Sequence, residues 1–243
     1  MEQETVRNIV AEDFRTAAVF EKYSIDFCCH GNVSLDEACK EHGVSVDEIR
    51  SELGSLAGQS DKVKDPFDSW ELDRLADYII NTHHQYVKSA IQSLLTHTGK
   101  IALVHGERHG ELLTIRDCFK NVAEEITQHM MKEELMLFPY IKALARSARE
   151  GTTVQRPPFQ TIWKPIRMME AEHESAGMGT ETIRTLSSSY IVPQDGCTTY
   201  RVTYQELEAF EQDLHKHVHL ENNILFPKAV ILEEKLLQSN KIL

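Results

Sequence analysis

The stretch HMMKEELMLFP, residues 129–139, returns near the end of the chain as HVHLENNILFP, residues 217–227. Both copies begin with histidine, carry a glutamate four residues later and end in Leu-Phe-Pro. Residues four apart in a helix lie on one face, one turn from each other. Each copy therefore presents an imidazole beside a carboxylate, and a repeat that keeps both groups predicts a site with approximate two-fold symmetry.

Apolar residues around the two copies recur at helical spacing, and strand-like alternation is scarce. Long helices are predicted at about residues 70–97, 111–149, 158–186 and 204–237, the last of them bent at Pro227. Four long helices joined by modest loops are typical of an antiparallel four-helix bundle. The chain is therefore expected to be all-α.

Each predicted helix carries a histidine on the apolar stripe that should face the bundle interior. The fourth helix places His217 and Glu221 there, and the third places His173. In the first helix His83 and His84 remain alternatives, because periodicity barely separates neighbours on that face. The stripe of the second helix reads Ile115, Phe119, Val122, Ile126, His129, Glu133, Met136 and Tyr140.

This pattern of inward polar residues predicts a metal site. A buried, unpaired carboxylate is destabilising by several kcal/mol, so it needs cations or hydrogen bonds. Two metal ions would compensate two carboxylates, with each histidine–glutamate unit giving a terminal nitrogen and a bridging carboxylate. Nitrogen and oxygen ligands without cysteine fit iron or manganese, and zinc less specifically. One inward histidine is more often a hydrogen-bonded core residue, but the pattern on all four helices favours metal.

Two other residues are candidates for the surroundings of this site. His105, in the segment LVHGE before the second helix, is expected near the mouth of the site as a ligand or a close neighbour. Glu172 precedes His173 in the sequence. It is expected either to orient that imidazole or carry protons, or to be an ordinary solvated glutamate.

The N-terminal part of the chain is predicted to form a separate small helical domain. A helix is expected over residues 6–22, and two short helices should start at the capping boxes SLDE, residues 34–37, and SVDE, residues 45–48. A polar stretch containing Gly and Ser follows and reads as a linker. The expected division is a domain at 1–56, a linker at 57–68 and the bundle at 69–243.

The segment DFCCH, residues 26–30, holds two adjacent cysteines in this small domain. A disulfide between neighbours would strain the peptide that joins them, so Cys28 and Cys29 are not expected to form a structural disulfide. Two thiols before Gly31 can bind a soft cation, accept a nitrosyl or change redox state. The alternative is that they are two small residues that pack the domain.

Composition limits the kinds of partner. The chain of 243 residues has 26 basic and 38 acidic residues and a formal net charge of -12. This balance argues against non-specific binding to nucleic acid or to an anionic membrane. No apolar run approaches the ~20 residues of a membrane span, and the acidic, amphipathic start is unlike a signal peptide. Five cysteines with no export signal indicate reduced thiols and a cytoplasmic location.

Two sets of segments carry a family resemblance. MMEAEHESAG, residues 168–177, and the second copy of the repeat resemble the hemerythrin-like HHE domain. YSIDFCCHGNVSLDEAC, residues 23–39, resembles the ScdA N-terminal domain. Together they cover nearly the whole chain, which is similar to the Repair of Iron Centers family of ScdA/YtfE-type di-iron proteins. The family places a histidine four residues before a basic residue, which favours His84, ahead of Lys88. The resemblance implies a ligand set of His84, His129, Glu133, His173, His217 and Glu221.

The resemblance also implies a function. A non-haem pair of iron ions with an oxo or hydroxo bridge would serve the repair of iron–sulfur proteins damaged by oxidative or nitrosative stress. The chain would donate iron, handle NO, or both; an NO-reducing enzyme and a non-enzymatic donor remain alternatives. Cys28 and Cys29 would then pass iron or NO to or from the bundle. The rival interpretation is an O2- or NO-binding sensor or an iron store, and the sequence leaves a homodimer open.

Overall fold

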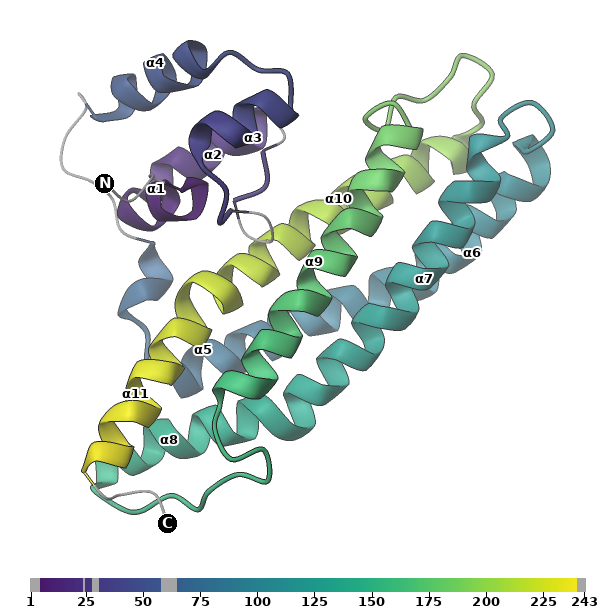
Figure 1. Ribbon diagram of the computed structural model, residues 1–243. Coiled ribbons are helices and arrows are strands. Elements are labelled where there is room, and N and C mark those ends of the chain that lie inside the picture. Colours follow the sequence, from purple (N-terminus) through teal and green to yellow (C-terminus); the bar gives the residue numbers. More distant parts are fainter. Residues whose placement is uncertain (1–4, 24, 28–30, 58–64, 240–243) are drawn as a thin grey trace.

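The computed structural model describes residues 5–23, 25–27, 31–57 and 65–239. Long helices dominate this part of the chain (Figure 1), and the strand-like pairing found in it is an isolated bridge between Thr5 and Ser34. The prediction of an all-α fold is confirmed. Cys28 and Cys29 lie outside the described residues, as does most of the expected linker, so the division at 57–68 stays a prediction.

The N-terminal helices are short. The predicted helix over residues 6–22 is interrupted at Asp13, whose carboxylate accepts a hydrogen bond from the backbone N–H of Arg15. Ser34 and Glu37 form the expected capping box at the start of the short helix α3 (Leu35–Glu41). The elements are α1 (Val6–Glu12), η1 (Phe14–Thr16), α2 (Ala17–Lys22), α3 (Leu35–Glu41) and α4 (Val46–Ala57).

Four long arms follow the short turn η2 (Pro66–Ser69) and run up and down beside one another (Figure 1). The first arm packs against the second and fourth, and the third also packs against these two. The first arm is α5 (Leu72–Ile79), η3 (Ile80–His84) and α6 (Gln85–His105). The second is α7 (Glu111–Lys132), η4 (Glu133–Leu137) and α8 (Phe138–Glu150). The third is α9 (Trp163–Leu186), and the fourth is α10 (Thr198–His219), η5 (Leu220–Leu225) and α11 (Phe226–Gln238).

Three arms contain a π-helical turn: η3, η4 and η5. Such a turn inserts a residue into the helix and often marks a functional site. In the second arm it shifts the inward stripe, so that Leu137 is 1% exposed whereas Met136 is 51% exposed. The expectation that Met136 faces the interior is therefore wrong. The turns η4 and η5 are followed by Pro139 and Pro227 in the first turn of the next helix, where a missing N–H is tolerated.

The interior of the bundle consists of two apolar clusters with a polar layer between them. One cluster includes Val87 and Ile126, and the other includes Ile79 and Leu137. Both pairs flank the candidate site residues of the first two arms along the helix axis. The polar side chains are therefore shielded from water at both ends by packed hydrocarbon.

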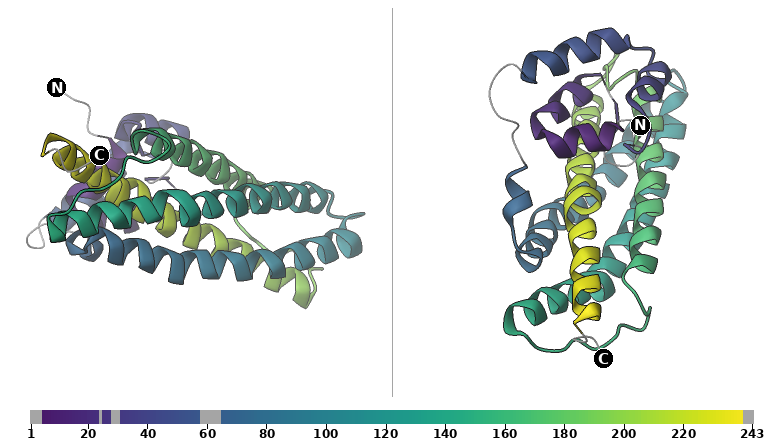
Figure 2. Two further views of the ribbon diagram at one scale, coloured as in Figure 1. Left: turned by 90° about the horizontal axis from the view of Figure 1, so that it is seen from below. Right: turned by 60° about the vertical axis from the view of Figure 1, so that its left-hand side comes forward.

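The N-terminal helices pack on the bundle rather than standing apart from it. Phe20 belongs to the same apolar cluster as Phe119 of α7. The rings of Phe14 and Phe27 lie 5.4 and 5.6 Å from the ring of His219 in α10. Figures 1 and 2 show the purple and blue helices beside α10. The small unit thus completes its core with side chains from the fourth arm.

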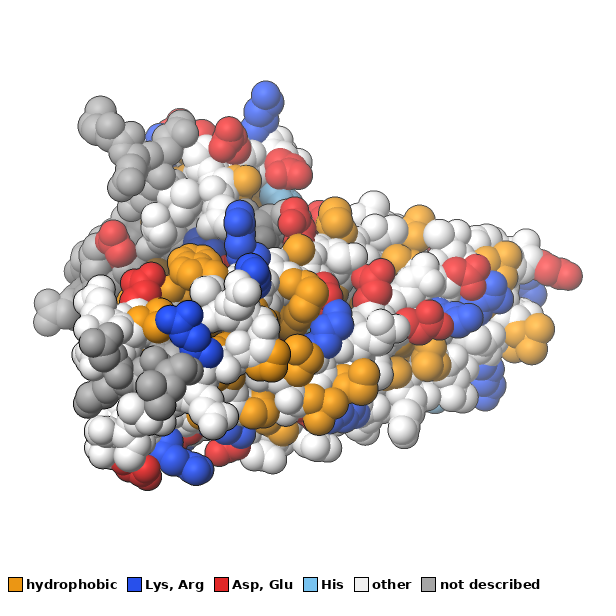
Figure 3. Space-filling view, turned by 60° about the horizontal axis from the view of Figure 1, so that its bottom comes forward, with side chains coloured by type: hydrophobic (Ala, Val, Ile, Leu, Met, Phe, Trp, Pro, Cys, Tyr) orange, Lys and Arg blue, Asp and Glu red, His pale blue; other side chains and the backbone are white. Residues whose placement is uncertain are grey.

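The surface in Figure 3 carries Lys and Arg side chains interspersed with acidic and hydrophobic ones. Large side chains that remain exposed on the bundle include Leu135, Met136 and Trp163. None of the helices within the described ranges combines the length and the apolar character that a membrane crossing requires.

The close approach of α7 and α9 gives a prediction about stability. A Cβ atom at Gly179 would lie 2.3 Å from Cγ2 of Val122, and a β-branched side chain in a helix has little rotameric freedom with which to yield. We expect Gly179→Ala to be less stable than Gly99→Ala by about 1–3 kcal/mol, although alanine favours the helix at both positions. Urea denaturation of the two variants measures this difference.

Gly99→Ala is the matched control, because a Cβ atom at this position of α6 meets nothing within 4 Å. A double-mutant cycle of Gly179→Ala with Val122→Ala should show positive coupling, since the shorter side chain makes room. Equal stability of the two alanine variants would contradict the packing of α7 on α9.

Candidate metal centre

Six buried side chains converge in the polar layer of the bundle, and each is at most 1% exposed. They form two overlapping groups that could hold a metal ion, with ligand atoms within 4.8 Å of one another in each. Site A consists of His84, His217, Glu133 and Glu221, and site B consists of His129, His173 and the same two glutamates. The structure thus brings together all six residues that the family resemblance implies, and it places His84 rather than His83 in the group.

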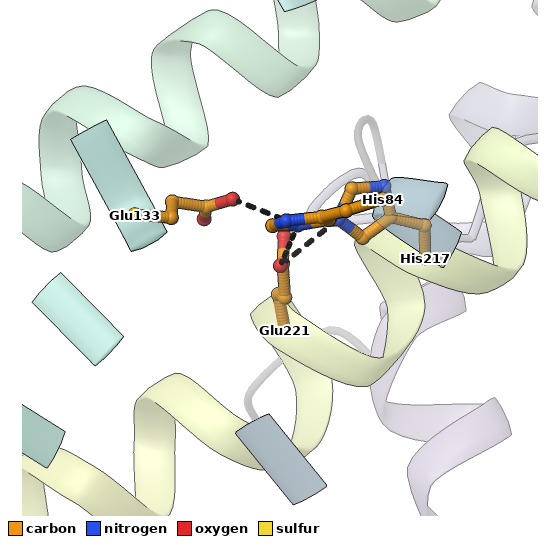
Figure 4. A group of neighbouring side chains, drawn as sticks. All are labelled: His84, Glu133, His217 and Glu221. Atoms are coloured by element: carbon orange, nitrogen blue, oxygen red, sulfur yellow. Dashed lines mark hydrogen bonds and ion pairs between the residues drawn. The ribbon is translucent and has the colours of Figure 1, made fainter. Parts of the chain in front are cut away.

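Site A lies between the first, second and fourth arms. Nε2 of His84 is 3.1 Å from Nε2 of His217. Nε2 of His217 is 3.0 Å from Oε1 of Glu221, and Nε2 of His84 is 3.4 Å from Oε2 of Glu133. Figure 4 shows the carboxylates of both glutamates pointing toward the two imidazoles. Two nitrogens and two carboxylates therefore face a common point.

Site B repeats this arrangement with the other two histidines. Nε2 of His129 is 2.9 Å from Nε2 of His173. Nε2 of His129 is 3.2 Å from Oε2 of Glu133, and Nε2 of His173 is 3.0 Å from Oε2 of Glu221. Glu221 therefore directs one oxygen to each site, and Glu133 lies within reach of both. This is the placement of carboxylates that bridge two cations.

The local fold explains how these groups reach the interior. His84 is the last residue of η3, Glu133 is the first of η4, and Glu221 lies in η5. The Phe near the end of each copy of the sequence repeat, just before the Pro, covers a histidine of another arm. The ring of Phe138 stacks on His84 at 5.7 Å, and the ring of Phe226 stacks on His173 at 6.2 Å. The repeat therefore builds both the ligand groups and their apolar cover.

The hydrogen bonding of the carboxylates fits a cation. Among the described residues, no hydrogen bond of good geometry reaches either oxygen of Glu133 or Oε2 of Glu221, although all three atoms are buried. The two Oε2 atoms lie 3.2 and 3.0 Å from the nitrogens of His129 and His173, which are themselves candidate ligands. A buried carboxylate oxygen without a donor is destabilising unless positive charge lies beside it. Histidine nitrogens and carboxylate oxygens are ligands that iron, manganese and zinc accept. The donor set and the unsatisfied oxygens thus match a pair of such ions.

The pKa values show the same demand for positive charge. Burial alone would lower the pKa of His84, but the nearby carboxylates of Glu133 and Glu221 outweigh it and raise the pKa to about 9. His129 is likewise buried, yet the carboxylate of Glu133 raises its pKa to about 10. Burial lowers the pKa of His217 below its usual value, in contrast to the other two imidazoles. Burial opposes ionisation of Glu133 and Glu221, but the neighbouring imidazoles hold both pKa values below the usual range.

The outward nitrogen of three of these histidines is held by a polar side chain. Such contacts fix the ring so that Nε2 faces the site, and they raise the basicity of the ligand. Each glutamate partner also forms an ion pair with a lysine, from Lys88 or Lys132. The three contacts are His84 Nδ1 to Glu134 at 2.8 Å, His129 Nδ1 to Glu172 at 3.0 Å and His173 Nδ1 to Asn222 at 2.9 Å.

Two expectations about the surroundings need correction. His105 ends α6, whose 21 residues follow His84 and span roughly 30 Å of helix. Its Nε2 lies 3.3 Å from Sγ of Cys197, so the expectation that it lies near the site is wrong. Glu172 does orient an imidazole, but the partner is His129 of the neighbouring arm rather than the adjacent His173.

Sequence reasoning missed Glu134 and Asn222. Each directly follows a glutamate of the repeat, at equal positions in the two copies. That equivalence was a usable signal, because side chains next to a buried ligand on a helix can reach the adjacent arm. The difference in residue type, an acid in one copy and an amide in the other, hid the common role.

Comparison with known families supports this description. A model of the hemerythrin HHE cation binding domain matches residues 75–229, which include all six residues of the two sites. The ScdA_N model, described as a domain of unknown function (DUF542), matches residues 2–57. The larger domain is therefore of a cation-binding type, and it contains the buried histidines and glutamates that such binding requires.

Several relatives resemble the chain along most of its length. The iron-sulfur cluster repair protein YtfE of Dickeya chrysanthemi is 32% identical over 216 residues, covering 89% of this chain and 91% of that protein. A probable iron-sulfur cluster repair protein of Haemophilus influenzae is 33% identical over 220 residues, covering 89% and 91%. The YtfE protein of Cronobacter sakazakii is 33% identical, covering 90% and 93%. The chain belongs to the Repair of Iron Centers family, with an ScdA-type N-terminal domain followed by a hemerythrin-like HHE domain.

Proposed function

We propose that this chain repairs damaged iron–sulfur clusters and uses a pair of iron ions held in sites A and B. The observation that carries the proposal is the sharing of Glu133 and Glu221 by two histidine pairs in a water-shielded layer. The names of the relatives support the biological role, since they are called iron-sulfur cluster repair proteins and match this chain nearly end to end. The partners are accordingly iron–sulfur proteins.

The residues suit either a donor of iron or a binder of a small diatomic ligand. Bound iron supplies a redox-active centre with positions open to NO or O2. The protein provides four imidazoles and two carboxylates for two ions, which leaves such positions unfilled. Oε2 of Glu133 lies beside His84 and His129, whereas Oε1 has no hydrogen-bond partner among the described residues, so this oxygen is available for a second mode of binding. We propose that this freedom eases both ligand entry and iron release.

Cys28 and Cys29 are proposed to take part in the transfer of iron or NO. Adjacent thiols are soft ligands that can hold a cation briefly or accept a nitrosyl. Phe27, which precedes them, contacts His219 in α10, two residues after His217 of site A. Phe27 therefore places the start of the cysteine segment against the fourth arm, which carries His217 of site A.

Metal analysis tests the proposed centre. We expect anaerobically purified wild-type protein to bind two iron ions per chain, one for each group. His84→Ala should retain about half of this iron, because it removes one nitrogen from site A only. Glu221→Ala should retain less, because this carboxylate faces both sites. Inductively coupled plasma spectrometry of the iron content gives the answer.

His97→Ala is the matched control for metal content. His97 lies in α6, the helix that begins directly after His84. It is partly exposed, and its Nδ1 lies 2.7 Å from Oε2 of Glu206, away from the two sites. Its replacement should leave the iron content unchanged. Wild-type protein with no iron, or a full iron content in Glu221→Ala, would refute the proposed centre.

Activity measurements separate the alternatives. The reduced protein is expected to return iron to a damaged cluster that has lost iron but kept its sulfide, followed by absorbance, or to release N2O when NO is added anaerobically. Either activity should be lost in Glu221→Ala, which lacks a shared carboxylate. Reversible, stoichiometric O2 binding without either activity would instead identify a sensor or store and overturn the repair function.

The cysteine pair has its own test. Cys28→Ser with Cys29→Ser should lower repair in cells under nitrosative stress while leaving the iron content of the bundle intact, because histidines and glutamates of the bundle make up the two sites. Cys197→Ser is the control. Cys197 is exposed at the start of α10, at the opposite end of this helix from His217 of site A. Wild-type repair by the double variant would show that the thiols have no transfer role.

A further inference from the structure

The two sites are related by the approximate two-fold symmetry of the bundle. The repeat pairs the second arm with the fourth, so His129 corresponds to His217 and Glu133 to Glu221. The first and third arms must then correspond, which pairs His84 with His173. Under this relation site A and site B exchange, and every residue beside a ligand has a counterpart beside the equivalent ligand.

One pair of outer partners obeys this symmetry. Glu134 follows the shared Glu133 and accepts the hydrogen bond from Nδ1 of His84 at 2.8 Å. Its counterpart Asn222 follows Glu221 and accepts from Nδ1 of His173 at 2.9 Å. One histidine in each site is therefore oriented in the same way, by the residue after a shared glutamate.

The other pair breaks the symmetry. Glu172 precedes His173 and accepts from Nδ1 of His129 at 3.0 Å. The counterpart of Glu172 is His83, which precedes His84. The His83 ring instead stacks on His217 at 5.7 Å with an interplanar angle of 10°, and its Nδ1 lies 3.0 Å from Asp213. Within the described chain, Nδ1 of His217 is buried and has no hydrogen-bond partner.

This difference bears on how firmly each site holds its ion. A hydrogen-bond acceptor on the outer nitrogen, such as a carboxylate or an amide oxygen, fixes the ring and increases the donor strength of the inner nitrogen, and its loss typically lowers metal affinity about 10–100-fold. In site B both imidazoles have such a partner, from Glu172 and Asn222. In site A, within the part of the chain that the structure describes, His84 has one and His217 has none. The shared glutamates serve both sites, so they do not cancel the difference.

We propose that the iron ion of site A is the one that the protein gives up, because His83 leaves the imidazole of His217 without an acceptor. This inference rests on the proposed function and specifies which of the two ions is the cargo. The species released is the ferrous ion, so the step changes coordination without changing oxidation state. The ion in site B keeps its two oriented histidines and both carboxylates. His83 is a positioning residue in this account, since it acts through His217.

Chelation kinetics test the assignment. Full-length, anaerobically reduced protein with its iron content measured is mixed with an excess of a ferrous chelator, and the coloured complex is followed by absorbance. We expect two phases, each releasing about one iron per chain, with rates that differ about 10–100-fold. His84→Ala, which damages site A, should remove the fast phase and leave the slow one.

Two substitutions at the asymmetric position should move different phases. In His83→Gln the amide oxygen can accept from Nδ1 of His217 while the amide N–H2 donates to Asp213, so the fast phase should slow. Glu172→Ala removes the acceptor from His129, so the slow phase should accelerate toward the fast one. His97→Gln is the control and should alter neither rate. Thermal melting of each variant by circular dichroism establishes that it is folded.

The outcomes separate this inference from the proposed function. Two bound iron ions that leave at one rate would overturn the assignment while the di-iron centre stands. A folded His83→Gln variant with an unchanged fast phase, or a Glu172→Ala variant that changes the fast phase alone, would also overturn it. Wild-type protein that binds no iron pair would instead refute the proposed function on which the inference rests.

Discussion

The structure depends on compensating two carboxylates that lie in a dry interior. Glu133 and Glu221 are fully buried and close enough to repel each other. Charges in such a place persist only when opposite charges stand beside them. Four imidazoles surround the pair, one from each arm, and the raised pKa values of His84 and His129 show how strongly this environment favours a cation. The four arms pack so that the four imidazoles and the two carboxylates lie in one layer of the bundle.

Much of this centre could be predicted from sequence, because helical periodicity and the internal repeat are both visible there. The inward positions of His129, Glu133, His217 and Glu221 follow from spacing alone. The family pattern was needed to choose His84 over His83. Periodicity failed at Met136, since a π-helical turn shifts the register by one residue and leaves no mark in the spacing of apolar residues.

Contacts between arms were harder to foresee. His105 was expected near the site because it precedes the second helix, but a long helix carries it to the far end of the bundle. Glu172 was paired with its sequence neighbour, whereas a side chain on a helix points toward another arm and reaches His129. These errors share one cause: the sequence gives the face of each helix, while the axial alignment of separate helices depends on loops and packing.

The internal repeat has a consequence for how such a protein can be altered. Two helical hairpins related by a two-fold axis resemble a homodimer whose halves have been joined in one chain. In a true homodimer every substitution appears twice, so both halves of the centre must stay alike. Here positions 83 and 172 hold different residues although they are equivalent in space. Covalent joining therefore lets each half diverge alone, and a symmetric scaffold can acquire two unequal compartments through substitutions in one half.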